Sequence, residues 1–248
     1  MKRAASNPPI LLIALAVQIL VATAADKHPD GDTLARQMRD GVPDKPIVST
    51  ATLKRRGEKN QRSTLPIRYQ VAPEADGWRA IYEVVSTNHP AEKLTIIHRN
   101  GQTNQYLYAK ADGIGKAPGE GRLLGTDGTM QPFGNTDFWI ADLGIEFLHW
   151  PVQRIVKNEM KNSQACHVLE SIRTNSPATG YTRVLSWVDI DTGGIVQAEA
   201  YNEKKQLVKE FSTRSVQKVA GEWQVKELEI RSKAGDTRTR LEFDLADP

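Results

Sequence analysis

Residues 181–202 read YTRVLSWVDIDTGGIVQAEAYN, two runs of strand-forming residues on either side of a glycine pair. This pattern predicts two β-strands, over 181–190 and 194–202, separated by the turn sequence Asp191-Thr192-Gly193-Gly194. A tight turn of this kind joins antiparallel strands, so the stretch predicts a β-hairpin.

The same pattern extends in both directions along the chain. Upstream, Ile67, Tyr69 and Val71 alternate with polar residues, and Asn100-Gly101 lies between two alternating runs, which is a strong hairpin signal. Further strands are predicted near 152–158, 165–173, 206–218, 222–232 and 237–245. Consecutive strands with short turns indicate a mainly β chain built as an antiparallel meander.

A short amphipathic helix is predicted over residues 32–41, before the first alternating run. Asp32 is the expected N-cap, Leu34 and Met38 lie one turn apart, and Gly41 followed by Pro43 ends the helix.

Two segments in the middle of the chain interrupt the β pattern. Residues 110–132 are rich in glycine and predict a long loop with one short strand around Leu123. Residues 133–150 read FGNTDFWIADLGIEFLHW, with Asn135 or Thr136 as the expected helix cap. This second segment is too apolar for an exposed helix and lies between two groups of strands. We interpret it as a helical lid, bracketed by Gly134 and Gly144, over the apolar face of the sheet.

The N-terminus has the features of a secretory signal peptide. Lys2 and Arg3 precede an apolar run from residue 10 to 22, and Ala22-Thr23-Ala24 is a small-residue cleavage site, so we expect a cut after Ala24. The alternative is an uncleaved anchor, but the run is shorter than the roughly 20 residues that span a bilayer. We therefore expect a signal peptide at 1–24 and a single domain at 25–248.

Charge is nearly balanced in the expected mature chain. The chain has 33 basic and 30 acidic residues, and Lys2 and Arg3 are removed with the signal peptide, so the expected mature chain has 31 basic and 30 acidic residues. This balance argues against nucleic-acid binding, which needs a clustered basic face. The exception is the basic cluster Lys54, Arg55, Arg56, Lys59 and Arg62, which either contacts an anionic headgroup or forms a solvated strand end and turn.

The chain carries weak catalytic signals, and each has a simpler explanation. Asp191-Thr192-Gly193 spells the aspartic-protease triplet, but that chemistry needs two carboxylates and a hairpin turn explains the triplet better. The glycines at 119–125 miss the dinucleotide-binding spacing, and the five histidines are not at metal-ligand spacing. Cys166, the only cysteine, cannot form an internal disulfide and is expected to be buried. We therefore predict no enzyme, cofactor or metal site.

Several longer stretches resemble one known family. They are Arg122-Leu-Leu-Gly125, Phe133–Leu143, Tyr181–Asp189, Ala198–Tyr201, Lys209-Glu-Phe211, Gly221-Glu-Trp223 and Thr239–Phe243. Over about residues 62–247 the chain resembles the outer-membrane lipoprotein-sorting proteins related to the LolA and LolB carriers. The resemblance implies a single, strongly curved antiparallel sheet, an unclosed β-barrel, whose helical lid covers a cavity for acyl chains.

The apolar residues of these segments are the candidate lipid-binding residues. The expected lid residues are Phe138, Trp139, Leu143, Phe147 and Trp150. The expected facing wall comprises Tyr69, Tyr82, Ile96, Tyr106, Tyr108 and Trp187.

The resemblance implies a monomeric periplasmic carrier that moves lipid or lipoprotein acyl chains towards the outer membrane. An inner-membrane transporter would supply the cargo and an outer-membrane acceptor would receive it. Two alternatives stay open: an envelope-stress sensor that signals through a protein partner, and an enzyme on lipid or glycan that uses Asp137 or Asp142.

Overall fold

The computed structural model describes residues 10–11, 29–41, 43, 45–125, 127–174, 180–219 and 222–245. Apart from the two-residue strand β1 (Ile10–Leu11), the predicted signal peptide and its cut after Ala24 lie outside these residues.

One large sheet contains every strand that the structure describes. Thirteen strands follow an antiparallel path, and β1 pairs with β13 in parallel, off this path. In spatial order the path runs through β7 (Arg122–Leu123), β6 (Gln105–Lys110), β5 (Glu92–Arg99), β4 (Gly77–Val84), β3 (Arg62–Glu74), β2 (Ile47–Arg56), β14 (Thr237–Phe243), β13 (Glu222–Ser232), β12 (Leu207–Val219), β11 (Ile195–Tyr201), β10 (Arg183–Asp189), β9 (Gln164–Ile172) and β8 (Val152–Lys161).

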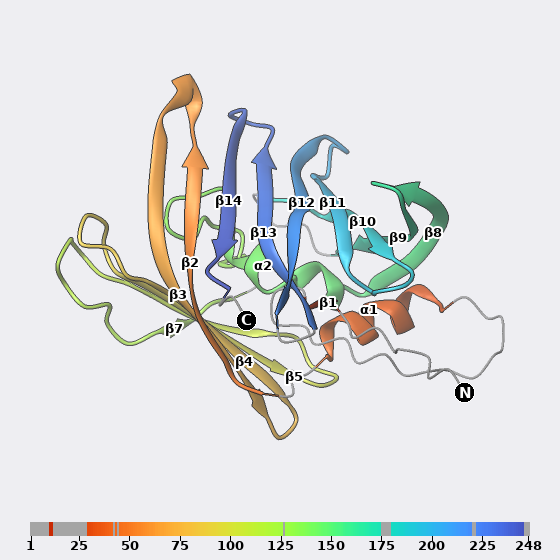
Figure 1. The fold of residues 1–248 in the computed structure, drawn as a ribbon, viewed down its shortest axis with the longest axis horizontal. Coiled ribbons are helices and arrows are strands. Elements are labelled where there is room, and N and C mark those ends of the chain that lie inside the picture. The colour runs from red at the N-terminus through yellow and green to blue at the C-terminus, as the bar shows by residue number, and fades with distance from the viewer. Residues whose placement is uncertain are drawn as a thin grey trace.

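Two meanders make up this sheet. The first runs from β2 to β7 and the second from β8 to β14, and the pairing of β2 with β14 joins them in the middle. In the described part of the chain β7 and β8 remain at opposite edges and do not pair with each other, so the curved sheet does not close into a barrel (Figure 1). This confirms the predicted mainly β fold with one unclosed antiparallel sheet.

The connection between the two meanders crosses the inner face of the sheet. The chain leaves β7 at one edge and must reach β8 at the other. On the way it forms α2 (Ile140–Leu143) and the 3-10 turn η2 (Glu146–His149). Figure 1 shows α2 inside the curve of the sheet. The position of residues 133–150 between two sheet halves is therefore a consequence of the β2–β14 pairing.

The strands bury one set of alternating side chains on this inner face. In β3 Leu65, Ile67, Tyr69 and Val71 are buried, whereas Arg68 is exposed, as the alternation predicts. A short 3-10 turn, η1 (Glu58–Asn60), joins β2 to β3.

The N-terminal helix α1 (Gly31–Arg39) packs against β8 and η2. Its N-cap is Asp30, whose carboxylate accepts from the Thr33 amide at 2.8 Å, so the prediction of Asp32 as the cap is wrong by two residues. Asp32 instead lies in the first turn, where its charge favours the helix dipole. At Gly31 a Cβ atom would lie 2.4 Å from the Arg154 backbone, so only glycine permits this close approach to β8.

The lid prediction is correct in position but wrong in helical extent. No helix begins at Asn135 or Thr136. Gly134 and Asn135 both have left-handed backbone angles, with φ of 60° and 54°, and the Thr136 hydroxyl donates to the Phe133 carbonyl. These features form a turn, and the chain becomes helical only after Trp139.

The predicted turns agree with the structure. The Asn100-Gly101 turn joins β5 to β6, and Asp191-Thr192-Gly193 lies in the hairpin turn between β10 and β11. The loop before the lid contains the short strand β7 at Leu123, as expected. Among the described residues, no helix is long and apolar enough to cross a membrane.

Candidate functional site

Residues 133–150, called the lid segment from here on, lie between the two halves of the curved sheet. Phe133, Phe138, Ile140 and Leu148 are completely buried, although they belong to a segment with only two short helical turns. The burial of these side chains against the sheet therefore holds the lid segment in place, more than its own helical hydrogen bonds do.

Ten of the eleven candidate residues meet in the main hydrophobic core. Nine are buried members of that core, and Trp139 is partly buried against it. The wall residues Tyr69 and Tyr82 have ring centroids 4.9 Å apart, and Tyr82 lies edge-on to Phe133 of the lid segment at 6.3 Å. The ten residues are Phe138, Trp139, Leu143, Phe147, Trp150, Tyr69, Tyr82, Ile96, Tyr106 and Tyr108.

Trp187 is the exception, because it lies in a separate cluster. It packs with Cys166, Val168 and Val196, away from the lid segment. Its indole N–H donates to Glu159 at 2.5 Å, so the ring belongs to the outer surface of the sheet. Cys166 is completely buried in this cluster, as the sequence predicts.

A buried lysine anchors the middle of the lid segment to the sheet. Lys209 of β12 is 3% exposed, and its ammonium donates to Asp142 Oδ2 at 2.6 Å and to the Asp137 carbonyl at 2.8 Å. The same ammonium lies 3.6 Å from the ring centroid of Trp139, in a cation–π contact. Asp142 also accepts from the Tyr181 hydroxyl at 2.7 Å. Burial lowers the pKa of Lys209 to about 8, even though Asp142 opposes this shift.

Asp137 provides a second anchor, on β14. Its two carboxylate oxygens accept from the hydroxyls of Thr237, at 2.5 Å, and Thr239, at 2.7 Å. The Asp137 amide donates back to Thr239 at 3.0 Å, and Arg55 lies 3.8 Å from the carboxylate. Because Asp137 and Asp142 are both occupied in fastening the lid segment, their contacts point to a structural role for these carboxylates.

Glu92 of β5 provides the third anchor, at the beginning of the lid segment. It is 1% exposed and accepts from the Gly134 amide and from the Tyr108 hydroxyl, both at 2.9 Å. Lys110 lies 2.8 Å from its other oxygen. The polar attachments of the lid segment therefore reach both meanders of the sheet.

A small apolar pocket lies between the lid segment and the second meander. Phe147 and Ile145 border it on one side, and Ala198, Ala200 and Phe211 border it on the other. Its volume is about 30 Å³, enough for one or two water molecules. Ligand pockets commonly measure about 300–1,000 Å³, so this closed form leaves no room for a long apolar chain.

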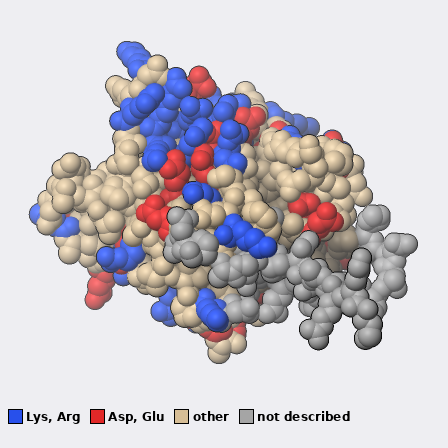
Figure 2. All heavy atoms as spheres, viewed as in Figure 1, with Lys and Arg blue, Asp and Glu red and all other residues tan. Residues whose placement is uncertain are grey.

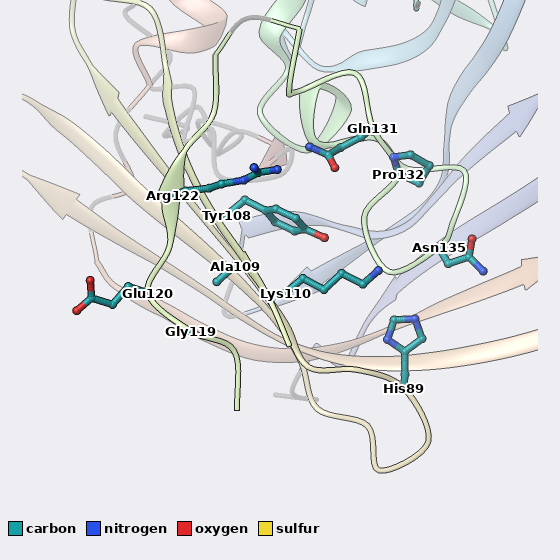
Figure 3. A pocket seen from close by; sticks show the side chains of 10 residues that line it. All are labelled: His89, Tyr108, Ala109, Lys110, Gly119, Glu120, Arg122, Gln131, Pro132 and Asn135. Carbon is teal, nitrogen blue, oxygen red and sulfur yellow. The ribbon is translucent and has the colours of Figure 1, made fainter. Parts of the chain in front are cut away.

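A larger polar hollow of about 730 Å³ lies at the other end of the lid segment. Figure 3 shows Tyr108, Lys110 and Gln131 pointing into it, while Glu120 points away. Asn135 of the lid segment forms part of its wall, so any displacement of the lid segment reshapes this hollow.

Two histidines lie where α1, η2 and the first meander meet. The His98 ring stacks on Trp78 at 5.0 Å and lies 5.4 Å from the His149 ring. Burial, followed by the nearby charges of His98 and Arg39, lowers the pKa of His149 to about 3. Burial also lowers the pKa of His98, although Asp40 lies 3.4 Å from its ring nitrogen. The contact between His149 of the lid segment and His98 of β5 therefore depends on both imidazoles being neutral.

Lys209 and Glu92 were not among the predicted site residues. Both carry charges that alternation normally assigns to the solvent side of a strand. One signal was available for Lys209: it is two residues from Phe211, and therefore shares its face of β12. The same signal was available for Glu92, which is two residues from Leu94 and shares its buried face of β5, although its partners Gly134 and Tyr108 become neighbours only in the folded chain.

Similarity to solved structures defines the fold. A DUF1329 family protein from Desulfovibrio piger matches with a TM-score of 0.69 and 16% identity over 86% of this chain and 90% of its own. An outer membrane lipoprotein-sorting protein domain from Vibrio parahaemolyticus matches with a TM-score of 0.67 and 17% identity, over 86% of this chain and 90% of its own. A LolA superfamily protein from Nitrosomonas europaea matches with a TM-score of 0.55 and 15% identity, over 89% of this chain and 96% of its own. The fold is thus that of the LolA-like lipoprotein-sorting proteins.

A protein-family model described as "Uncharacterized protein" matches residues 86–247, well over half of the chain. The chain belongs to this family. The LolA-like fold of the chain agrees with the resemblance inferred from the sequence. No curated protein sequence matches the chain.

Proposed function

We propose that this protein is a periplasmic carrier that holds the acyl chains of lipids or lipoproteins between the lid segment and the inner face of the sheet. The observation that carries the proposal is the apolar pocket under the lid segment, where Ala198 and Ala200 leave space that larger side chains fill elsewhere in the core. The LolA-like fold supports it, because one structure with this fold is described as an outer membrane lipoprotein-sorting protein domain.

Binding requires the lid segment to move, because the closed pocket is too small. Burial of about ten methylene groups contributes about 8 kcal/mol. Breaking a buried ion pair such as Lys209–Asp142 costs about 3–5 kcal/mol. An acyl chain of this length can therefore offset the release of the Lys209–Asp142 anchor, which borders the pocket, while the Asp137 and Glu92 anchors stay in place.

We further propose that the carrier works as a monomer, receives its cargo from an inner-membrane transporter and delivers it to an outer-membrane acceptor. The predicted signal peptide supports a location outside the cytoplasm. Recovery of one stable protein partner from envelope extracts, without any lipid cargo, would favour the stress-sensor alternative instead.

Native mass spectrometry of the purified mature chain tests the proposal. We expect a population carrying one lipid or acylated peptide, which dissociates as an intact mass and is identified by fragmentation. Ligand-free protein in every preparation, together with failure to take up a fluorescent fatty acid, would contradict it.

A further inference from the structure

The outward face of four adjacent strands, β3, β2, β14 and β13, concentrates basic side chains near one end of the sheet. In the register of the sheet Arg62 lies opposite Arg56, Arg56 opposite Arg238, and Arg238 opposite Arg231. Residues directly opposite one another share a face, so these four form one row across four strands, called the arginine row. Figure 2 shows the resulting basic patch over the upper ends of β2, β14 and β13.

The arginine row is only partly neutralised within the protein. Arg231 pairs with Glu229 at 2.9 Å. Within the described ranges, no carboxylate lies within ion-pair distance of Arg56, Arg62 or Arg238. Like charges placed directly opposite each other destabilise a sheet, so this arrangement is unfavourable in the free protein. An external anion would relieve it.

A hollow of about 510 Å³ lies between the two turns at this end of the sheet. Arg56, Arg231 and Arg238 line it, and Lys59 adds a further positive charge from the β2–β3 turn. Glu58 and Asp236 are the acidic lining residues, so positive charge is in excess. The hollow is large enough for a phosphate-bearing headgroup.

We propose that the arginine row is a membrane-docking surface that binds the phosphate headgroups of an anionic phospholipid bilayer. A bilayer presents many phosphates in one plane, and the arginine row presents four guanidinium groups across neighbouring strands about 5 Å apart. Because the expected mature chain is nearly neutral overall, the arginine row is a local excess of positive charge and not part of a generally basic surface.

The residues around the row favour a bilayer over a single-stranded nucleic acid. Binding of that kind combines basic residues with aromatic side chains on which bases stack. Between Arg62 and Arg68 the outward positions of β3 hold Thr64 and Pro66, and β14 carries Arg240 and Glu242 beside Arg238. None of these residues is aromatic.

Vesicle co-sedimentation of the mature wild-type chain tests the proposal, with phosphatidylcholine vesicles prepared with and without phosphatidylglycerol. We expect binding only to the anionic vesicles, weakening as salt is added. Each basic residue near an anionic surface contributes about fivefold to partitioning, so the triple variant Arg56→Gln/Arg62→Gln/Arg238→Gln should bind about a hundredfold more weakly.

The matched control removes three exposed charges elsewhere, as Lys116→Gln/Lys204→Gln/Lys205→Gln. It should retain nearly all vesicle binding, and both variants should retain uptake of a fluorescent fatty acid, which separates membrane docking from acyl binding. Equal loss in both triple variants would overturn the proposal, because it would reduce the effect to net charge. Equal binding of the wild type to neutral vesicles, or displacement by matched inorganic phosphate or a short DNA strand, would also overturn it.

Discussion

The substitution Lys209→Met removes the charged anchor of the lid segment while keeping a long apolar stem. In the wild type the ammonium, 3% exposed, lies 2.6 Å from Asp142. After the substitution Asp142 keeps the Tyr181 hydroxyl and the Trp139 amide as donors, both at 2.7 Å, but its charge is left without a counterion. Removing one partner of a buried pair costs about 3–5 kcal/mol, and the two remaining donors place the expected loss near 3 kcal/mol.

Urea denaturation of the wild type, Lys209→Met, Asp142→Asn and the double variant measures this loss. We expect each single variant to lose about 3 kcal/mol and the double variant to lose little more. The reason is that Asp142→Asn removes the carboxylate charge that Lys209→Met leaves without a counterion. Hydrogen exchange should show the earliest loss of protection in the lid segment. Either of two results would refute the reasoning. One is a loss below about 1 kcal/mol for Lys209→Met, and the other is a loss for the double variant that lies within about 0.5 kcal/mol of the sum of the two single losses.

Three further predictions concern two residues of the lid segment and one residue of the outer cluster. His149 has a pKa of about 3 when folded and 6.5 in its ordinary state. The unfolded chain therefore takes up the proton first, so stability falls as pH drops below 6.5, by about 2 kcal/mol at pH 5. His149→Gln should flatten this part of the profile of stability against pH, measured by urea denaturation. An unchanged profile would exclude His149 as the source of the pH dependence. Gly144→Ala places a methyl group 2.4 Å from the Tyr106 hydroxyl and should cost about 1–3 kcal/mol, measured by thermal unfolding, whereas an unchanged Tm would contradict the packing. Trp187→Leu should lower stability without changing uptake of a fluorescent fatty acid, and reduced uptake at unchanged stability would return Trp187 to the site.

The strands were predictable because their signals are local. Alternation in β3 and turn residues such as Asn100-Gly101 act over a few positions, and the structure confirms both. The pairing of β2 with β14 is different, because nothing local in either strand specifies a partner about 190 residues away. The crossing of the lid segment depends on this pairing, so the sequence indicated a lid between two sheet halves without showing why it must cross the sheet.

Alternation groups residues by face but does not say which face is buried. In β10 Val184 and Val188 belong to the main core, whereas Leu185 and Trp187 belong to the outer cluster, so alternation is unbroken along the strand. Both sets contain large apolar residues, so the sequence favours neither face. The prediction that Trp187 faces the lid segment failed for this reason.

The helix predicted at the start of the lid segment failed through competition between local signals. Asn135 and Thr136 are good helix caps, but they also favour turns, and Asn135 adopts the left-handed conformation beside Gly134. The Asp137 side chain is then bound by Thr237 and Thr239 of a distant strand, which fixes the turn. Tertiary contacts thus decided between two conformations that the sequence allowed.

Acyl binding beneath the lid segment is tested most directly by filling the pocket that Ala200 leaves open. Ala200 is 8% exposed on the inner face of β11, and Gln197 of the same strand pairs with Trp187 on the outer side. Titration of a fluorescent fatty acid should show tight uptake by the wild type and by Gln197→Leu, and at least a tenfold loss for a folded Ala200→Phe variant. Equal uptake by Ala200→Phe and the wild type would contradict binding at this site.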